Sequence, residues 1–544
     1  MSGILSIGKS ALNAAQMGLS VTGHNIANAN TPGYSRQILG QSAALAQSFG
    51  ASYIGQGVEV SSVSRVYNEI LSTQVVNSQS NSAAADTYKT ELNAINNMMS
   101  DASAGLNPAL NDFFAGMQDL SASPSDIPTR QSFLSNAQSL VNRFQSTSNR
   151  LNEIRNGINT QLTSNVGLVN VYASQIASLN DTIEKTVNAG SGQPNDLLDQ
   201  RDQVISDLSK LIKTTSVPQG QGSLNIYIGN GIPLVIGTTT MKLATVSSTT
   251  DPTRLEVAYK SNGTSNTLSM NSLPGGSIGG LLQFRAESLD PAQNQIGQIA
   301  TVLASDFNAQ HIQGSDLNGN VGGNLFTLAD PAVTAKSANS GNAVLASAII
   351  DAHALTSSDY RLQFDGTNYK VTRLTDGTVT TPVSFPQTID GLSFDVSSGA
   401  MASGDEFLIS PTRNAATNIR LAITDPKKLA MGSSTAPTGP GDNSNGLLLT
   451  ELQTQTTMNN GTTSYSSAFG QLVNTVGNKT HELQVSAAAE AQVLQLNIDA
   501  VQAESGVNLD EEATNLIRFQ QAYQAAGKMM QIASQLFDSL LQLG

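Results

Sequence analysis

The two ends of the chain carry the same spacing of apolar residues. Near the start, an apolar residue recurs every seven positions, at Leu5, Leu12, Leu19 and Ile26. A small residue follows three places after each of these, at Gly8, Ala15, Thr22 and Ala29. A seven-residue spacing is typical of a helix that packs along a narrow seam. Because Pro32 cannot continue helical hydrogen bonding, the pattern predicts a first helix that stops near Asn30.

The last part of the chain repeats this spacing. Apolar residues recur every seven positions at Leu509, Leu516, Tyr523, Met530 and Phe537, and the positions three residues later hold Phe519, Ala526, Ala533 and Leu540. Asn508 can cap this helix, with Glu511 as its capping-box partner. An isolated amphipathic helix leaves its apolar stripe in water, so each terminal helix needs a partner. The simplest partner for one terminus is the other.

A second set of helices lies inside the two ends. An apolar stripe with three- or four-residue steps runs through residues 151–187, within a helical stretch of about 60 residues that would span on the order of 90 Å. Such lengths are used by rods and bundles. A similar stripe at 469–501 predicts a helix that ends at Gly506. Two shorter amphipathic stretches, 196–212 and 281–311, complete a helical bundle.

Strand patterns lie between these helices. Alternating apolar residues occur within a Gly-, Ser- and Thr-rich segment at 214–275, which predicts a small β insert. A clearer unit follows at 346–412, where Asp-Gly pairs mark turns between alternating stretches. Helices flank both segments, so the strand-rich units are insertions carried by the bundle.

The expected fold class is therefore multidomain α+β: a long-helix bundle and terminal coiled-coil helices formed by both chain ends, with inserted all-β modules. The expected domains are a terminal helical coiled-coil domain (1–62 with 506–544), a helical bundle (63–213 with 276–345 and 413–505), a β-rich insert whose attachment the sequence leaves open (214–275) and an outer all-β domain (346–412).

Composition excludes several classes of function. The 27 basic and 41 acidic residues give a net charge of −14, which opposes binding to nucleic acids. The chain has no cysteine, so thiolate metal sites, iron-sulfur clusters and cysteine nucleophiles are excluded. No apolar run is long enough to span a bilayer, and the first residues lack a Sec signal pattern. We therefore expect no membrane insertion and no Sec-dependent export.

Candidate chemistry is weak. Ser277 lies in a G-x-S-x-G match at 275–279, the pattern of a serine nucleophile on a strand-to-helix elbow, but no buried apolar strand precedes it. No metal-ligand spacing joins the four histidines, His24, His311, His353 and His481. The first three ligands of a calcium loop are imitated by Asp316, Asn318 and Asn320, but the required glycine and glutamate are missing, which favours a polar turn. We expect no catalytic, metal or cofactor site.

Several stretches resemble a known family. The segment NIANANTPGYSRQ at 25–37 resembles the amino-terminal signature of bacterial flagellar axial proteins, and it contains Asn28, Asn30, Thr31, Pro32, Gly33 and Tyr34. The segment GVNLDEEATNLIRFQQAYQAAGKMM at 506–530 is similar to the matching carboxyl-terminal signature. Within these proteins, PNDLLDQRDQVISDLSKL at 194–211, FNAQHIQGSDLNGN at 307–320 and SDYRLQFDGTNYKVTR at 358–373 resemble the hook-associated protein 1 family.

This resemblance implies a non-enzymatic structural adaptor at the junction of hook and filament, exported through the flagellar type III apparatus and located in the extracellular flagellum. It implies four partners: further copies in a helical ring, the hook protein, the second hook-associated junction protein, and an export chaperone on the carboxyl-terminal helix. The alternatives are another flagellar axial component, such as the second junction protein or a hook-type protein, and, much less favoured, a secreted serine esterase that uses Ser277.

The heptad pattern supplies a physical basis for assembly. The expected assembly interface consists of Leu5, Leu12, Leu19, Ile26, Leu509, Leu516, Phe519, Tyr523, Met530, Phe537 and Leu540. We expect both terminal helices to be mobile in the isolated subunit and to pair on incorporation, so that folding is coupled to assembly. Before assembly, the chaperone would cover the exposed stripe of Leu516, Tyr523, Met530 and Phe537.

Overall fold

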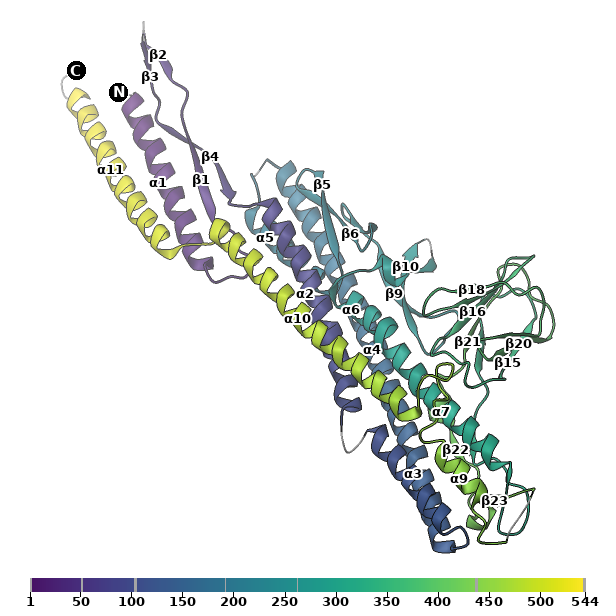
Figure 1. Ribbon diagram of the computed structural model, residues 1–544. Coiled ribbons are helices and arrows are strands. Elements are labelled where there is room, and N and C mark those ends of the chain that lie inside the picture. The colour runs from purple at the N-terminus through teal and green to yellow at the C-terminus, as the bar shows by residue number, and fades with distance from the viewer. Residues whose placement is uncertain are drawn as a thin grey trace.

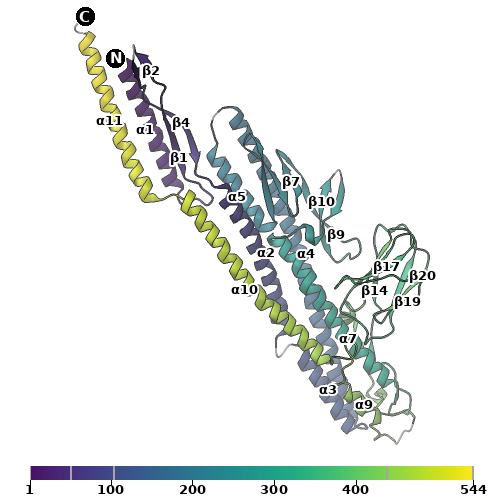
Figure 2. The same ribbon diagram turned by 45° about the horizontal axis from the view of Figure 1, so that its top comes forward.

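The computed structural model describes residues 2–49, 52–101, 105–190, 192–261, 263–435 and 439–541. These residues form an elongated rod of long helices, with strand-rich units on one side of it (Figure 1). Both chain ends lie together at one end of the rod in the views of Figures 1 and 2. Among the described helices, none combines the length and the apolar character needed to cross a membrane.

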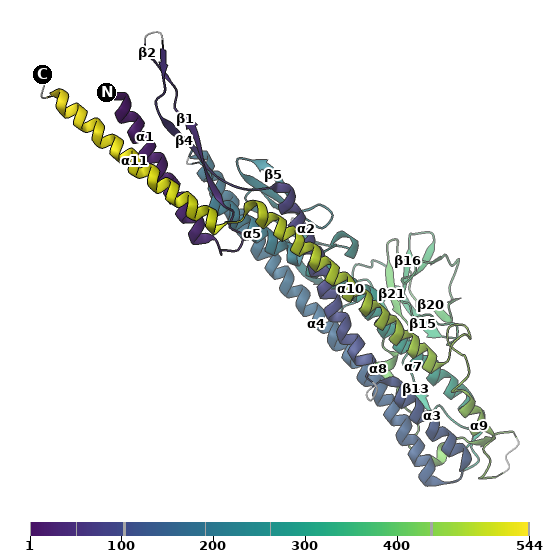
Figure 3. The same cartoon turned by 60° about the vertical axis from the view of Figure 1, so that its left-hand side comes forward.

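The terminal unit contains two helices and a long hairpin. Helix α1 (Ser2–Asn28) lies beside α11 (Leu509–Leu541), and α1 ends slightly before the predicted Asn30. Next to α1, β1 (Gln37–Ala43) pairs antiparallel with β4 (Val58–Arg65). The shorter strands β2 (Gln47–Phe49) and β3 (Ser52–Ile54) extend the hairpin beyond the start of α1 (Figure 3).

The bundle is built around three long helices. α4 (Ile127–Asn188) has 62 residues, in agreement with the predicted length, while α2 (Glu69–Met99) and α10 (Tyr465–Ser505) lie side by side along the rod. The remaining bundle helices are α3 (Leu106–Ala122), α5 (Asn195–Leu211), α6 (Gly276–Phe284), α7 (Asp290–His311), α8 (Ala415–Asn418) and α9 (Ser444–Glu451).

The helix predicted at 281–311 is interrupted. It begins earlier, at Gly276, and a π-helical turn at Arg285–Leu289 separates α6 from α7. Pro291 lies at the start of α7, and proline has no N–H with which to continue the helical ladder. A local change in hydrogen bonding therefore accommodates the proline without ending the helical path.

Aromatic side chains fill the core of the bundle. The ring of Phe113 on α3 lies 5.2 Å from that of Phe133 on α4 and 4.8 Å from that of Phe307 on α7. Tyr465, the first residue of α10, stacks on Phe114 at 6.2 Å. All five side chains are buried. Four helices from distant parts of the sequence thus share one apolar cluster.

The β insert consists of two small sheets that pack on α4. The first contains β5 (Thr214–Gly220), β6 (Ser223–Ile228), β7 (Ile232–Ile236) and β8 (Thr239–Thr240); the second contains β9 (Lys242–Ser247), β10 (Leu255–Ser261) and β11 (Thr264–Thr267). Asn170 of α4 donates to the Leu243 carbonyl and accepts from its N–H, both at 2.9 Å. Asn180 makes the same two kinds of bond with Leu224. Side-chain amides therefore attach the insert to the long helix.

The outer domain begins earlier than predicted. Its larger sheet has the order β14 (Ala332–Ala335), β21 (Glu406–Ser410), β16 (Tyr360–Phe364), β17 (Tyr369–Arg373) and β18 (Val379–Thr380), and its smaller sheet has the order β15 (Val344–Ile349), β20 (Leu392–Ser398) and β19 (Gln387–Ile389). The predicted start at 346, and with it the helical assignment of 332–345, is wrong. β14 has only four residues. It forms a strand because it pairs with the distant β21, and no local sequence pattern indicates this pairing.

Short strand pairs close the far end of the bundle. β12 (Gly314–Ser315) pairs with β23 (Gly432–Ser433), and β13 (Phe326–Thr327) pairs with β22 (Arg420–Leu421). Single helical turns occur at Met270–Ser272 and Pro426–Lys428. With its terminal helix pair, its bundle and its two β units, the molecule confirms the predicted α+β fold class.

Candidate assembly interface and polar hub

Glycine and alanine bring the two terminal helices together. Ala15 of α1 is buried, as are Ala526 and Ala533 of α11. The Met530 side chain covers Gly8, where an added Cβ would lie 2.7 Å from the sulfur. The Phe519 ring covers Gly18 in the same way, since a Cβ there would lie 2.5 Å from Cδ1. Small residues therefore set a close approach, and large side chains of α11 fill the space above them.

The larger heptad residues lie beside this contact line. On α1, Leu5, Leu12 and Leu19 are half-buried and Ile26 is exposed. On α11, Phe519 and Met530 are half-buried, while the exposed fraction is 53% for Leu509, 38% for Leu516, 43% for Tyr523 and 49% for Phe537. The side chain of Leu540 lies outside the described part of the chain. The structure thus leaves much of the predicted apolar stripe accessible.

A second apolar flank occurs on α11. Met529, Ile532 and Leu536 have exposed fractions of 37%, 57% and 48%. At 3.6 residues per turn they lie on the other side of the line through Ala526 and Ala533 from Leu516 and Tyr523. The heptad pattern does not include this flank, although its three- and four-residue spacing is visible in the sequence. The paired helices therefore expose apolar surface on both sides of α11. This surface is wider than a single neighbouring helix would cover.

The amino-terminal motif closes on itself around Asn25. This buried side chain donates from Nδ2 to the Gln37 carbonyl and accepts from the Gln37 N–H, both at 2.9 Å. The Tyr34 hydroxyl donates to the same Asn25 oxygen at 2.7 Å. Burial, together with nearby carboxylates, raises the pKa of Tyr34, so its hydroxyl remains a donor. Asn25 thus fixes the end of α1 to the start of the hairpin.

Helix α5 meets this motif through its carboxylates. The Ser35 N–H donates to Asp199 at 2.9 Å, and Gln37 Nε2 donates to Asp196 at 2.7 Å. Arg65, at the end of β4, pairs with Asp199 and Asp202 at 2.7 Å each. Burial opposes the charge of Arg65, but the two carboxylates outweigh it and raise its pKa. Two stretches that the sequence singled out separately, 25–37 and 194–211, are therefore in direct contact.

The junction between α10 and α11 completes what we call the polar hub: Asn25, Ser35, Arg36, Gln37, Arg65, Asp196, Asp199, Asp202, Ser505 and Glu511. The Arg36 N–H donates to the Ser505 carbonyl at 2.8 Å, and its guanidinium pairs with Glu511 at 2.8 Å. Asn508 caps α11 as predicted, because its side chain accepts from the Asp510 N–H at 3.0 Å. The predicted capping-box role of Glu511 is not observed, since its carboxylate pairs with Arg36.

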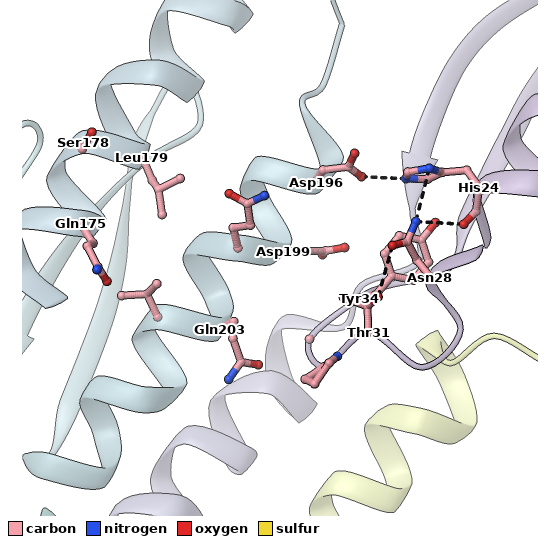
Figure 4. Close-up of a pocket in the computed structure, with 14 residues that line it drawn as sticks. His24, Asn28, Thr31, Tyr34, Gln175, Ser178, Leu179, Asp196, Asp199 and Gln203 are labelled. Carbon is pink, nitrogen blue, oxygen red and sulfur yellow. Dashed lines mark hydrogen bonds and ion pairs between the residues drawn. The ribbon is translucent and has the colours of Figure 1, made fainter. Parts of the chain in front are cut away.

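A groove of about 610 Å³ lies between the loop that follows α1 and helices α4 and α5 (Figure 4). Its motif side is lined by His24, Asn28, Thr31, Pro32, Gly33 and Tyr34, and Asn30 beside them is exposed. Gly33 has a φ of +78°, and a Cβ there would lie 2.7 Å from the Gln203 side chain, which accounts for glycine at this position. Among the described residues, no group of three or more possible ligands could hold a metal ion.

The serine motif has a packing explanation. A short helical turn, not a strand, precedes Ser277, and the hydroxyl accepts from Asn165 at 3.0 Å. Gly276 has a φ of +63°, and a Cβ there would lie 2.3 Å from backbone atoms of Leu211. Gly276 therefore allows the start of α6 to pack closely on the end of α5. Within the described residues, no hydrogen bond joins Ser277 to a histidine.

Comparisons with known proteins agree along the chain. Residues 92–326 match the family model of the flagellar hook-associated protein FlgK helical domain, and 334–411 match the D2-like domain of flagellar hook-associated protein 1. Residues 5–34 match the flagella basal body rod protein model, and 501–543 match the carboxyl-terminal model of the basal body rod FlgEFG proteins.

Whole proteins match as well. The chain is 38% identical to flagellar hook-associated protein 1 of Salmonella typhimurium and 36% identical to that of Escherichia coli, over the full length of both chains in each case. The solved structure of the flagellar hook junction protein FlgK from Burkholderia pseudomallei is similar with a TM-score of 0.74 and 30% identity, covering 80% of this chain and all of that one. The chain therefore belongs to the flagellar hook-associated protein 1 family.

Proposed function

We propose that this protein is a structural adaptor of the bacterial flagellum that joins the hook to the filament, and that it acts without catalysis. The observation that carries the proposal is the terminal helix pair, which exposes apolar residues on both flanks of α11. The names of its relatives, hook-associated protein 1 and hook junction protein, support the same role. Its partners would be further copies of itself, the hook protein and the second hook-associated junction protein.

Packing between copies would use the two flanks. One flank contains Leu516 and Tyr523, and the other contains Ile532 and Leu536. Because the flanks differ, the contact between neighbours is head-to-tail and not two-fold symmetric, and such contacts build rings or open helices. Each added copy would bury one flank of its neighbour and leave its own second flank free. In a helical assembly that does not close on itself, the last copy would in this way present a free apolar flank to the next component.

The proposed coupling between folding and assembly takes a specific form. We expected the terminal helices to pair only on incorporation, but they already lie side by side within one chain. The side chains that are completely buried in this contact are small, such as Ala15, Ala526 and Ala533, whereas Phe519 and Met530 are only half-buried. Part of the hydrophobic free energy of the large side chains is therefore released only when neighbours cover them. We propose that the pair is preformed but opens readily in the isolated subunit, and that burial of the two flanks by neighbours stabilises it.

Export would require the same surface to be covered. The exposed Leu516, Tyr523 and Phe537 would be contacted by an export chaperone, together with Met530 when α11 separates from α1. We propose export through the flagellar type III apparatus, with the extracellular junction as the final location. A chaperone that covers α11 would also prevent premature polymerisation of subunits.

The decisive experiment changes each flank separately. Leu516→Asp and Ile532→Asp are expected to abolish incorporation into flagella, because either change places a charge in a packed interface. Gln531→Asp is the matched control, since it adds the same charge to an exposed polar position of α11. The measurement is the amount of the protein in purified hook and filament preparations, with swimming motility alongside. Normal incorporation of both flank variants would contradict the proposal.

A further inference from the structure

The strongest feature outside the terminal unit is a cluster of charges at the place where three parts of the molecule meet. Charged residues make up only 12% of the chain. Four arginines and four carboxylates nevertheless gather here and form ion pairs with one another: Arg155, Arg254, Arg285, Arg413, Asp251, Glu256, Asp290 and Asp359. We call this set the charge cluster. Its formal charges cancel.

The members of the cluster come from different parts of the molecule. Arg155 lies on α4, Arg285 in the π-helical turn and Asp290 at the start of α7, all within the bundle. The β insert supplies Asp251, Arg254 and Glu256, around the start of β10. The outer domain supplies Asp359, which directly precedes β16. Ion pairs join the insert directly to the bundle, through Arg254 with Asp290 and Arg285 with Glu256, and Asp359 of the outer domain pairs with Arg413.

Arg413 occupies the corner between them. It follows β21, where the chain leaves the outer domain and returns to the bundle. Its guanidinium pairs with Asp251 of the insert at 2.6 Å and with Asp359 of the outer domain. Its own backbone is held on the bundle, because the preceding residue, Thr412, donates from its hydroxyl to the Asn294 carbonyl of α7 at 2.9 Å. One side chain thus links both β units from a fixed point.

The close approach at this corner is also built into α7. Gly297 faces the backbone of Thr412, and a Cβ at Gly297 would lie 1.7 Å from the Thr412 oxygen. The second half of the cluster continues from the same helix, since Asp290 pairs with Arg155 at 2.6 Å and with Arg254 at 3.3 Å. Side-chain exposure is 13% for Arg413, 7% for Asp359, 4% for Arg155 and 1% for Arg285.

Buried ion pairs contribute little net stability, but they constrain the relative orientation of the groups that they join. The cost of removing charges from water offsets most of their attraction, and apolar residues of similar volume often give equal or greater stability. A guanidinium between two carboxylates, however, is satisfied only within a narrow range of angles and distances. Apolar contacts are non-directional and permit sliding. A cluster of this kind is therefore suited to fixing an orientation.

We propose that the charge cluster is an orientation lock. It holds the β insert and the outer domain at one angle on the bundle, so that the three move as one rigid body. The role of the terminal helices in assembly does not require this lock. Its consequence is that the outer domain of each copy in an assembly projects at a defined angle from the axis.

Two further contacts between the outer domain segment and α7 indicate how the lock would fail. His353 of the outer domain segment lies 2.6 Å from Asp306 of α7, at a different part of the same boundary. The Gln298 side chain of α7 also donates to the Leu355 carbonyl at 2.6 Å. When Arg413 is replaced, these contacts remain. The outer domain is then expected to pivot about them and not to detach.

The absence of cysteine makes the test direct. Spin labels are attached to two introduced cysteines at exposed positions, Ser164→Cys on α4 and Lys370→Cys on β17. Their separation is measured in the full chain by pulsed electron paramagnetic resonance. The unmodified cluster is expected to give one narrow distance distribution. Arg413→Gln is expected to give a broadened distribution or a second population.

Two further variants separate orientation from stability. Arg150→Gln removes a pair on α4 whose partners are 64% and 65% exposed, and it is expected to leave the distance distribution unchanged. The combined variant Arg413→Met, Asp359→Leu and Asp251→Asn replaces the corner with apolar and neutral groups. It is expected to fold with an unchanged melting temperature and still to show the broadened distribution.

A narrow distribution with the original mean in Arg413→Gln would overturn the proposal. If that variant does not fold, the combined variant decides the question. A narrow, unshifted distribution there would mean that packing and not charge sets the angle, and the lock would be refuted.

Discussion

Replacing Asn25 by alanine tests whether the polar hub stabilises the folded terminal unit against local opening. The change removes three hydrogen bonds and leaves the buried N–H and carbonyl of Gln37 without partners. A net hydrogen bond contributes about 1 kcal/mol and an unsatisfied buried polar group costs about 1–3 kcal/mol, so the local loss is about 3 kcal/mol. This loss corresponds to roughly a hundredfold increase in the population of the opened hub.

Amide hydrogen exchange followed by mass spectrometry measures this population. In Asn25→Ala, peptides that cover the end of α1 and strand β1 are expected to exchange about a hundredfold faster, while those of α7 keep their protection. Asn30→Ala is the matched control, because Asn30 belongs to the same motif but is exposed. If the two variants exchange alike, the hub does not hold the terminal unit, and the reasoning from Asn25 is refuted.

Two other changes test packing and charge. Gly18→Val places a side chain against Phe519 and is expected to destabilise the helix pair by about 1–3 kcal/mol. Gly23→Ala is the control: no atom lies near its Cβ, so it is expected to increase the protection of α1 amides in hydrogen exchange. Equal effects of the two changes would contradict the packing model. Asp405 is buried in the outer domain; burial opposes its charge, but hydrogen bonds from backbone N–H groups outweigh this and lower its pKa below the usual 3.8. Its stabilising contribution is therefore present above about pH 3.8 and is lost as pH falls through the lower folded-state pKa. Asp405→Asn should reduce the melting temperature at pH 7 and make the melting temperature less dependent on pH in the acid range. An unchanged melting temperature at pH 7 would disprove this role.

The order of helices and β units could be predicted from the sequence because their signals are local. Apolar periodicity identified α4 and α10 almost to their ends, and Pro32 and Gly506 marked helix ends. The small residues along α1 indicated a close-packed seam, and Gly8 is in contact with Met530 in the structure. Each of these features depends on residues within a few turns of one another.

The start of the outer domain and the second flank of α11 were not predicted for different reasons. β14 is specified by its pairing with β21, more than seventy residues away, so its own four residues carry too little information. The flank at Met529 and Ile532 was visible as a pattern, but a helix with a wide apolar surface does not reveal which part its partner covers. Only the position of α1 decided that.

The element types, the pairing of the two terminal helices and the family resemblance could be predicted from sequence alone, because periodicity and motifs are local features of the chain. Tertiary structure alone brought the motif at 25–37 against α5, redirected Glu511 from its helix cap to Arg36, and assembled Arg413 with Asp251 and Asp359. Such contacts join residues more than fifty positions apart. Charges and hydrogen-bonding groups carry no local mark of their partners, since each can be satisfied by any complementary group that the fold brings within reach.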